Sequence, residues 1–262
     1  EDNTLSEIGR MMAEFPLIPR HARVIVEAIR SYPEVVEEAV IASAFLSTNT
    51  PFVLPMGEEL EARRAHHRYR DDLGDFVSYL KLFAAYVDAP RKDRFCETRY
   101  LDPRTMGEIR NVKEQLEEVV SALGVPIGKG GSKADYLSAV AKGLIQFVCV
   151  RSGRDSYRSL TAERIMIHPG SVMFKESPRF IVAGEIVRTS RTYARSVSPL
   201  EASWIKRISP LLAESLVETE PGRQQKGGTR KKKGASRDTT WQIRIGTRLF
   251  PLKAGKRKKK TA

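Results

Sequence analysis

The spacing of apolar residues changes near residue 144, and this change most constrains the fold. Before it, apolar residues recur every three or four positions, as on one face of a helix; Ala22, Ile25, Val26 and Ile29 are an example. After it, turn residues separate the short β-type runs LIQFVCVR, SYRSL, RIMIHP, PRFIVAGEIVRT and RTYARSV. Several short strands in about 55 residues indicate a small barrel. The sequence therefore predicts an α+β multidomain chain, with a helical bundle first and a small β-barrel second.

Helix boundaries are marked by proline, glycine and small polar residues. Pro19 and Pro33 suit first helical positions, and Asp102 before Pro103 is a strong start signal for a long amphipathic helix. Gly124 is expected to end that helix.

Three further helices are expected. Asp75 is predicted to be the N-cap of a helix that buries Phe76. The other two are predicted around 133–143 and 200–208.

The net charge of +13 is unevenly distributed. Residues 221–262 carry 15 Lys and Arg against one acid, and residues 151–210 carry 11 against 5, whereas residues 1–150 carry 19 against 23. A local basic surface together with a basic tail indicates a polyanionic partner, although a basic tail alone can equally be a solvated, non-specific segment. Most of the tail is expected to be disordered, with a short hairpin at 241–253 that turns at Gly246-Thr247.

Composition also excludes several classes of protein. No stretch approaches the roughly 18 apolar residues of a membrane span. Two isolated cysteines, Cys96 and Cys149, suggest neither a disulfide framework nor a zinc site, which favours a reducing, cytoplasmic location. The start EDNTLSEIGR does not look like a signal peptide, and without Met it looks cut from a longer chain.

Two apparent ligand motifs do not meet the requirements of their chemistry. The segment 124–130 (GVPIGKG) has three residues between its glycines instead of four, and Gly follows Lys129 where a phosphate-binding loop has Ser or Thr. His66 and His67 are adjacent, so on a helix they point about 100° apart and do not converge on one metal ion. We therefore expect no cofactor or metal in this chain, and no ATP hydrolysis.

The most informative segment for binding lies at the end of one expected strand and the start of the next. Arginines alternate there with hydroxyl and aromatic side chains: Arg188, Thr189, Ser190, Arg191, Tyr193 and Arg195. Arginine makes bidentate phosphate contacts, hydroxyls bind phosphate or ribose, and an aromatic ring offers a surface for base stacking. The pattern predicts binding of single strands, and a solvated strand face remains the alternative.

Motifs in order along residues 1–212 resemble the C-terminal region of DEAH-box ATP-dependent RNA helicases, in wording closer to their bacterial branch. The matching segments are LSEIGR with FPL (5–17), IASAFLS (41–47), GDF with LKL (74–82), FC (95–96), EIR with QL (108–116), IHPGS with Phe174, EIV (185–187), TSR with Tyr193 and Arg195, and Trp204-Ile205. One departure is Gly74, where the family usually has Ser. A larger one is the absence of both RecA-like domains, of a DEAH-type acidic box and of most of the winged helix.

The resemblance implies a domain order. Residues 1–15 would end a winged helix, residues 16–143 would form the ratchet-like domain, residues 144–212 would form an OB-fold, and residues 213–262 would be a basic tail.

The resemblance also implies roles. The whole helicase would bind ATP and Mg²⁺ in its RecA-like domains and move along RNA, while this region would form one wall of the channel. RNA contacts would come from Arg110 and Lys113 on the long helix, and from His168, Ser171 and 188–195 on the OB-fold. The implied partners are single-stranded RNA, with DNA an open alternative, the RecA-like domains, and a protein activator at the OB-fold.

Two other classes of protein fit parts of the sequence. A free-standing OB-fold binder of single strands fits the barrel and the tail, but not the order of the helical motifs. A helical protein-interaction scaffold would leave the arginines as ordinary surface residues. RNA binding that weakens steeply with salt would separate the first two classes from the scaffold.

Overall fold

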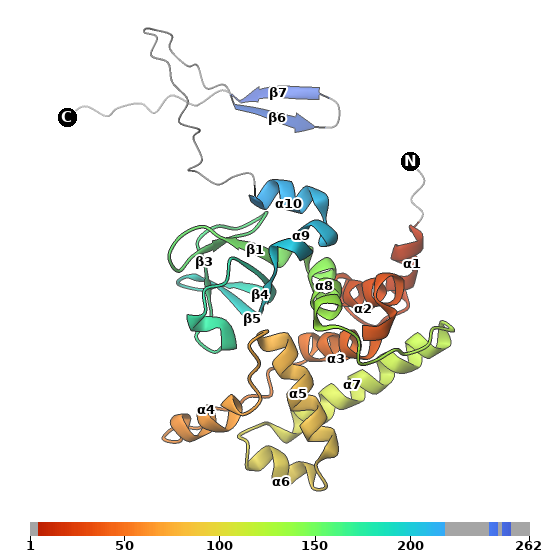
Figure 1. Ribbon diagram of the computed structural model, residues 1–262, viewed down its shortest axis with the longest axis vertical. Coiled ribbons are helices and arrows are strands. Elements are labelled where there is room, and N and C mark those ends of the chain that lie inside the picture. The colour runs from red at the N-terminus through yellow and green to blue at the C-terminus, as the bar shows by residue number, and fades with distance from the viewer. Residues whose placement is uncertain (1–4, 218–240, 246–247, 253–262) are drawn as a thin grey trace, which may run out of the picture. The chain divides into compact units, whose positions relative to one another are not determined.

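The computed structural model describes residues 5–217, 241–245 and 248–252 (Figure 1). The chain divides into two compact units, Glu1–Glu220 and Pro221–Ala262. The first unit contains the helices and the barrel. The second contains an antiparallel strand pair, β6 (Trp241–Ile245) and β7 (Arg248–Leu252), in the range of the predicted hairpin. The predicted turn at 246–247 and the remainder of the predicted tail beyond residue 217 lie outside the described residues.

Helices form the first part of the larger unit. They are α1 (Glu7–Ala13), α2 (Pro19–Ser31), the 3-10 turn η1 (Pro33–Val35), α3 (Val36–Ser47), α4 (Glu59–His67), α5 (Asp75–Asp88), α6 (Lys92–Glu97), α7 (Pro103–Ala122) and α8 (Lys133–Gly143). Pro19 begins α2 as predicted, and the Asp102 carboxylate caps α7 by accepting from the Thr105 N–H at 2.6 Å. Pro33 opens a 3-10 turn that leads into α3, so the predicted helix starts a turn late.

The predicted N-cap role of Asp75 is wrong. Asp75 is the first residue of α5, and Gly74 at the cap position offers no side chain. The Asp75 carboxylate instead accepts hydrogen bonds from the barrel, so a partner about a hundred residues away along the chain replaces the local cap.

A closed barrel follows the helices. Its elements are η2 (Ile145–Phe147), β1 (Val148–Arg151), β2 (Tyr157–Arg158), β3 (Ile165–Ile167), the 3-10 turn η3 (Val172–Lys175), β4 (Phe180–Arg188) and β5 (Thr192–Leu200). The strand order is β1-β2-β3-β5-β4, and β3 pairs with β5 in parallel while the other pairs are antiparallel. Two helices, α9 (Ala202–Ile208) and α10 (Pro210–Val217), complete the unit. Each predicted run overlaps one strand, and the predicted α+β class is confirmed.

The helices and the barrel share a hydrophobic core. One cluster joins buried residues of α2, α3 and α8 to barrel residues such as Val148, Phe180 and Val182. A second cluster fills the space between α5, α6 and α7, and a third fills the barrel interior around Tyr157 and Ile181. Leu144, at the predicted domain boundary, is fully buried in the shared core. The surfaces where the two parts meet therefore contain residues of both the helices and the barrel. The exact position of the domain boundary stays a prediction.

The structure also describes the helices with respect to a membrane span and the environment of the two cysteines. No helix in the described part of the chain is long and apolar enough to cross a membrane. Cys96 and Cys149 are both buried and free.

Candidate nucleic-acid interface

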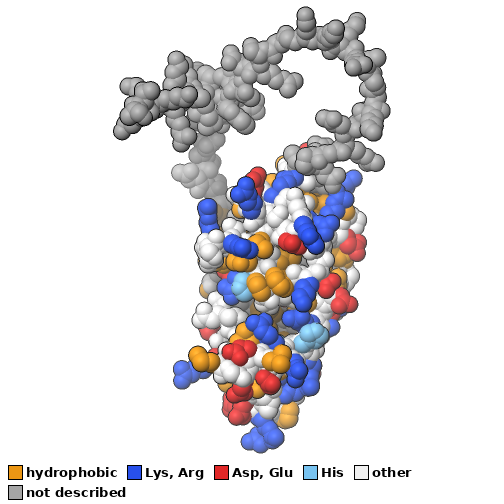
Figure 2. All heavy atoms as spheres, turned by 90° about the vertical axis from the view of Figure 1, so that its left-hand side faces the viewer, with side chains coloured by type: hydrophobic (Ala, Val, Ile, Leu, Met, Phe, Trp, Pro, Cys, Tyr) orange, Lys and Arg blue, Asp and Glu red, His pale blue; other side chains and the backbone are white. Residues whose placement is uncertain are grey.

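A hollow of about 540 Å³ lies where the helices meet the barrel. Its wall is formed by the start of α2, the end of α3 with the loop after it, α4, the start of α5, and barrel residues on β4, β5 and the segment before η3. Figure 2, which views the molecule from the left-hand side of Figure 1, shows Lys and Arg side chains both on the barrel and on the helices below it. We refer to this feature as the junction hollow.

Four arginines line the junction hollow, namely Arg20, Arg63, Arg70 and Arg195. Arg195 forms an ion pair with Glu185, which lies directly opposite it on β4, at 2.9 Å. The other three have no ion pair with a described residue. Because guanidinium groups without carboxylates attract anions and can bind phosphate through two N–H groups, the hollow is suited to a polyanion.

Three histidines also line the junction hollow, but burial keeps them from adding charge. Burial lowers the pKa of His21 to about 4, with the nearby Arg20 charge lowering it further. Burial is likewise the main cause that lowers the pKa of His66 and His168. At neutral pH the positive charge of the hollow therefore comes from its arginines, and the histidines act as neutral hydrogen-bonding rings.

Two nitrogen atoms of this wall are buried without a partner. The Arg20 Nε and His21 Nδ1 atoms have no hydrogen-bond partner within the described part of the chain. His21 is only 4% exposed, and the Arg20 guanidinium lies 5.7 Å from the centroid of the Phe147 ring. A buried polar group without a hydrogen-bond partner lowers the stability of the folded state by about 1–3 kcal/mol. A contribution to folding therefore does not account for these two groups.

Asp75 fixes the barrel wall of the hollow against the helices. Its carboxylate accepts from Ser171 Oγ at 2.6 Å, from the Val172 N–H at 2.9 Å and from the Val197 N–H at 2.6 Å. Burial raises the pKa of Asp75, and the three donors oppose that shift. One side chain at the start of α5 thus holds both η3 and β5 in place.

The same joint continues along α5. The Phe76 N–H donates to Ser198 Oγ at 3.2 Å, and the Tyr79 hydroxyl lies 2.7 Å from Ser196 Oγ. Gly74 allows the close approach, because a Cβ there would lie 2.4 Å from the Val197 carbonyl oxygen. The geometry of the hollow is therefore set by side chains and backbone that leave no room for a larger residue at 74.

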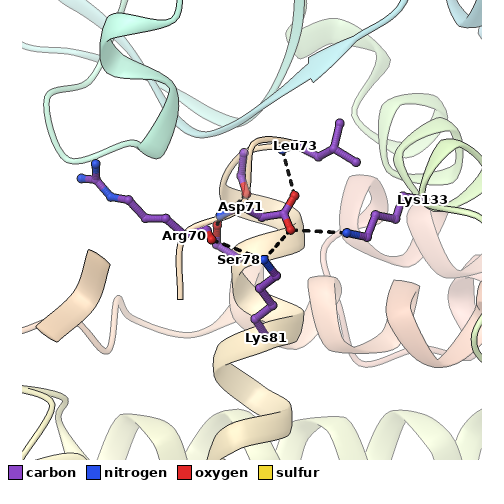
Figure 3. A network of polar contacts seen from close by, with 7 residues as sticks. Arg70, Asp71, Leu73, Ser78, Lys81 and Lys133 are labelled. Carbon is purple, nitrogen blue, oxygen red and sulfur yellow. Dashed lines mark hydrogen bonds and ion pairs between the residues drawn. The ribbon is translucent and has the colours of Figure 1, made fainter. Parts of the chain in front are cut away.

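A second carboxylate fixes the segment that carries Arg70 (Figure 3). Asp71 accepts from the Leu73 N–H at 2.9 Å and pairs with Lys81 at 2.6 Å and Lys133 at 3.3 Å. Burial would raise the pKa of Asp71, but the hydrogen bonds from Lys81 and Leu73 and the Lys133 charge outweigh it and lower the pKa. Figure 3 shows the Arg70 side chain extending away from this network.

Three of the predicted RNA-binding residues, His168, Ser171 and Arg195, line the junction hollow. The His168 ring packs edge-on against Tyr193, with ring centroids 5.6 Å apart, and its Nδ1 accepts from the Gly170 N–H at 3.1 Å. Ser171 is buried, and its hydroxyl donates to Asp75. Ser171 therefore shapes the wall, and contact of its hydroxyl with RNA stays a prediction.

The other predicted barrel residues, Arg188, Thr189, Arg191 and Tyr193, lie outside the lining. Arg188, Thr189 and Arg191 are exposed where β4 turns into β5, and the Thr189 N–H closes this turn on the Arg191 carbonyl at 2.8 Å. RNA contacts at these positions stay predictions.

The two residues predicted on α7 do not line the hollow either. Lys113 pairs with Glu117 at 2.7 Å and with Glu37 at 3.3 Å, and Arg110 lies 3.6 Å from Glu114. Their charges are largely compensated within the protein, and their contact with RNA also stays a prediction.

Three arginines of the junction hollow were not predicted as RNA-binding residues from the sequence: Arg20, Arg63 and Arg70. Arg63 and Arg70 lie in the run RRAHHRYR, whose local positive charge could have identified them. The net acidity of residues 1–150 conceals this run when charge is averaged over long segments.

Metal ligands are a separate question, because OB-fold and helical surfaces can also hold ions. Among the described residues, no group of three or more His, Cys, Asp or Glu side chains is arranged to hold a metal ion. The side chains that line the junction hollow include guanidinium, amide and imidazole groups.

Comparison with known families gives two matches. Residues 18–79 match the ratchet-like helicase associated domain (HA2), and residues 137–212 match the oligonucleotide/oligosaccharide-binding (OB) fold. The chain thus combines a helicase-associated helical domain with an OB-fold, and neither matched region is an ATPase domain.

Similar proteins include helicases from bacteria and animals. The chain is 39% identical over 208 residues to the ATP-dependent RNA helicase HrpA of Borreliella burgdorferi, covering 79% of this chain and 25% of that protein. It is 28% identical over 216 residues to HrpA of Escherichia coli, covering 78% of this chain and 16% of that protein. The human probable ATP-dependent RNA helicase DHX35 is 25% identical over 214 residues, covering 80% of this chain and 30% of that protein.

The resemblance noted in the sequence is therefore confirmed. The chain is similar to the C-terminal region of DEAH-box RNA helicases, which contains their helicase-associated domain and OB-fold. It spans a quarter or less of the length of these two HrpA proteins.

Proposed function

We propose that this chain binds single-stranded RNA in the junction hollow and guides it for the ATPase domains of a DEAH-box helicase. The observation that carries the proposal is a hollow at the joint between the helicase-associated helices and an OB-fold. Its helical side carries three arginines that form no ion pair with a described residue, and its barrel side adds Arg195. Guanidinium groups spread along a hollow suit a flexible phosphate chain, and small barrels commonly hold single strands.

The rigidity of the hollow supports this proposal. Asp75 and the close approach at Gly74 hold its helical wall against its barrel wall, and Asp71 fixes the segment that carries Arg70. A preformed wall loses little conformational freedom when a strand binds, so more of the contact energy is available for binding.

The remaining parts of the proposal concern the whole helicase. ATP and Mg²⁺ would be bound by RecA-like domains rather than by this chain, and the protein would work in the cytoplasm. A protein activator at the OB-fold would act on the ATPase rate.

The test compares two double variants of the full chain that remove the same charge from neighbouring positions. Arg63→Ala with Arg70→Ala removes two arginines from the junction hollow, whereas Arg64→Ala with Arg68→Ala removes two exposed arginines that do not line it. Binding of a labelled single-stranded RNA is measured by fluorescence anisotropy across a salt series. We expect the first variant to lose about 10-fold or more in affinity and to show a shallower salt dependence.

The control decides between a site and a general charge effect. The Arg64→Ala, Arg68→Ala variant should stay within about threefold of the wild type, because it retains the lining arginines. An equal loss in both variants would mean that RNA responds only to net charge. Wild-type protein that binds no RNA would favour the protein-interaction scaffold.

A further inference from the structure

The first turn of α2 places two adjacent side chains on the wall of the junction hollow. Arg20 and His21 both line it, although both are largely covered by neighbouring side chains. Their buried Arg20 Nε and His21 Nδ1 atoms have no partner among the residues described. Neither side chain forms an ion pair or a side-chain hydrogen bond with another described residue. Polar contacts within the fold therefore do not explain why these two groups are buried here.

We propose that Arg20 and His21 bind one phosphate group of the RNA backbone at the α2 end of the junction hollow. This inference rests on the proposed function, and it names a phosphate site that the sequence motifs did not indicate. Charge and donor number fit one phosphodiester: one guanidinium supplies the positive charge, and a neutral imidazole supplies an N–H donor. The lowered pKa of His21 is consistent with this neutral role.

The surroundings of the pair preorganise it. The His21 carbonyl accepts from the Ser43 hydroxyl at 3.2 Å, which ties this turn to α3. Arg20 packs over the Phe147 ring of the barrel side, a contact that positions the guanidinium without occupying it with an acceptor. The N-terminus of α2, a helix of 13 residues, adds a favourable partial charge for an anion.

Lys113 is a basic residue whose charge is neutralised within the fold, and it therefore serves as a comparison for Arg20. Lys113 is partly buried, as Arg20 is, but it pairs with two glutamates. Arg20 has no such partner within the described part of the chain, so its charge is available to a ligand.

The test uses the full chain and two readouts. In the first, anisotropy compares binding of a 12-nucleotide single-stranded RNA without terminal phosphates to Arg20→Ala, Arg20→Lys and Arg30→Ala. Arg30 is exposed near the other end of the same helix, so it controls for loss of one charge. We expect Arg20→Ala to weaken binding by about 10-fold or more, Arg20→Lys to be intermediate, and Arg30→Ala to stay within about twofold.

The second readout is the assigned His21 ring resonance of the wild-type protein, titrated with inorganic phosphate and with the same RNA. Both ligands should shift it, because both carry the phosphate group that the site would bind. An RNA-dependent shift that is lost in Arg20→Ala, together with the affinity loss, would support the site.

Three results would overturn the inference. If RNA binds, Arg63→Ala with Arg70→Ala weakens it, but Arg20→Ala behaves as Arg30→Ala, then the phosphate site is wrong and the proposed function stands. If RNA binds without shifting the His21 resonance, the inference is equally wrong. If inorganic phosphate shifts His21 while no RNA binds, the site serves a free anion and the proposed function fails as well.

Discussion

Two carboxylates near the start of α5 hold the walls of the junction hollow, and they do so with different chemistry. Asp75 accepts three hydrogen bonds from uncharged donors on the barrel, and its burial raises its pKa. Asp71 accepts from Lys81 and Lys133, and their combined effect lowers its pKa despite burial. As pH falls, protonation of Asp75 should therefore raise the free energy of unfolding, whereas protonation of Asp71 should lower it.

The Asp71 network predicts a pH-dependent contribution to stability. A carboxylate whose folded pKa is lowered contributes stability above its unfolded pKa, about 3.9, and loses it as pH falls through the folded value. Because Lys81 and Lys133 are about half exposed, we expect Asp71→Asn to lower the free energy of unfolding by only about 1 kcal/mol at pH 7. Urea unfolding at a series of pH values should show this difference shrink below about pH 4.

The neighbouring residue provides the control for that measurement. Asp72 is exposed and has no partner among the residues described, so Asp72→Asn should change the free energy of unfolding by less than about 0.5 kcal/mol. A difference between wild type and Asp71→Asn that stays constant down to pH 3 would contradict the assigned role.

Among single residues, the sequence indicated some that line the junction hollow and missed others for a physical reason. His168 and Arg195 were predicted and do line the junction hollow, whereas Asp75 was assigned to a local cap. Local patterns carry no information on partners such as Val197, which is far along the chain. Arg20 was missed because a lone arginine after proline looks like any helix start. Only the fold shows that none of the described carboxylates pairs with it.

Among the elements, α5 and β5 form the joint on which the hollow depends. Gly74 has φ 84° and ψ −162°, a conformation nearly restricted to glycine, and it lies against the backbone of Val197 and Ser198. The sequence showed Gly74 only as a departure from the Ser that the family usually has. The structure makes it a position where a side chain would force α5 away from the barrel.

A pair of glycine variants separates that contact from backbone strain. Gly57 has a similar φ of 87°, but a Cβ there would meet nothing within 4 Å. Gly57→Ala should therefore cost about 1–2 kcal/mol of stability through strain alone, and Gly74→Ala about 3 kcal/mol or more. Urea unfolding followed by circular dichroism measures both, and equal losses would contradict a tight joint between α5 and β5.

The elements themselves were predicted well because their signals are local. Helix α8 spans Lys133–Gly143, the range that the periodicity indicated, and the five expected β-type runs each overlap a strand of the barrel. The parallel pairing of β3 with β5 and the shared core of helices and barrel could not be predicted in the same way, because both join segments that are distant in the sequence.

In the larger compact unit as a whole, the distribution of charge matters more than its sum. Residues 1–150 carry more acids than bases, yet they supply Arg20, Arg63 and Arg70 to the junction hollow. Acids in this part pair with lysines that do not line the hollow, for example Glu117 with Lys113 on α7. The result is a local positive surface on a part of the chain whose composition is acidic.

The central claim is that single-stranded RNA lies in the junction hollow, and photo-crosslinking tests it most directly. The full chain is irradiated with a single-stranded RNA that contains 4-thiouridine, and the crosslinked peptides are identified by mass spectrometry. We predict crosslinks to peptides from 48–54, 63–70 and 168–172, which line the hollow. Crosslinks confined to 188–191 or to 221–262, with none to the lining segments, would contradict the claim.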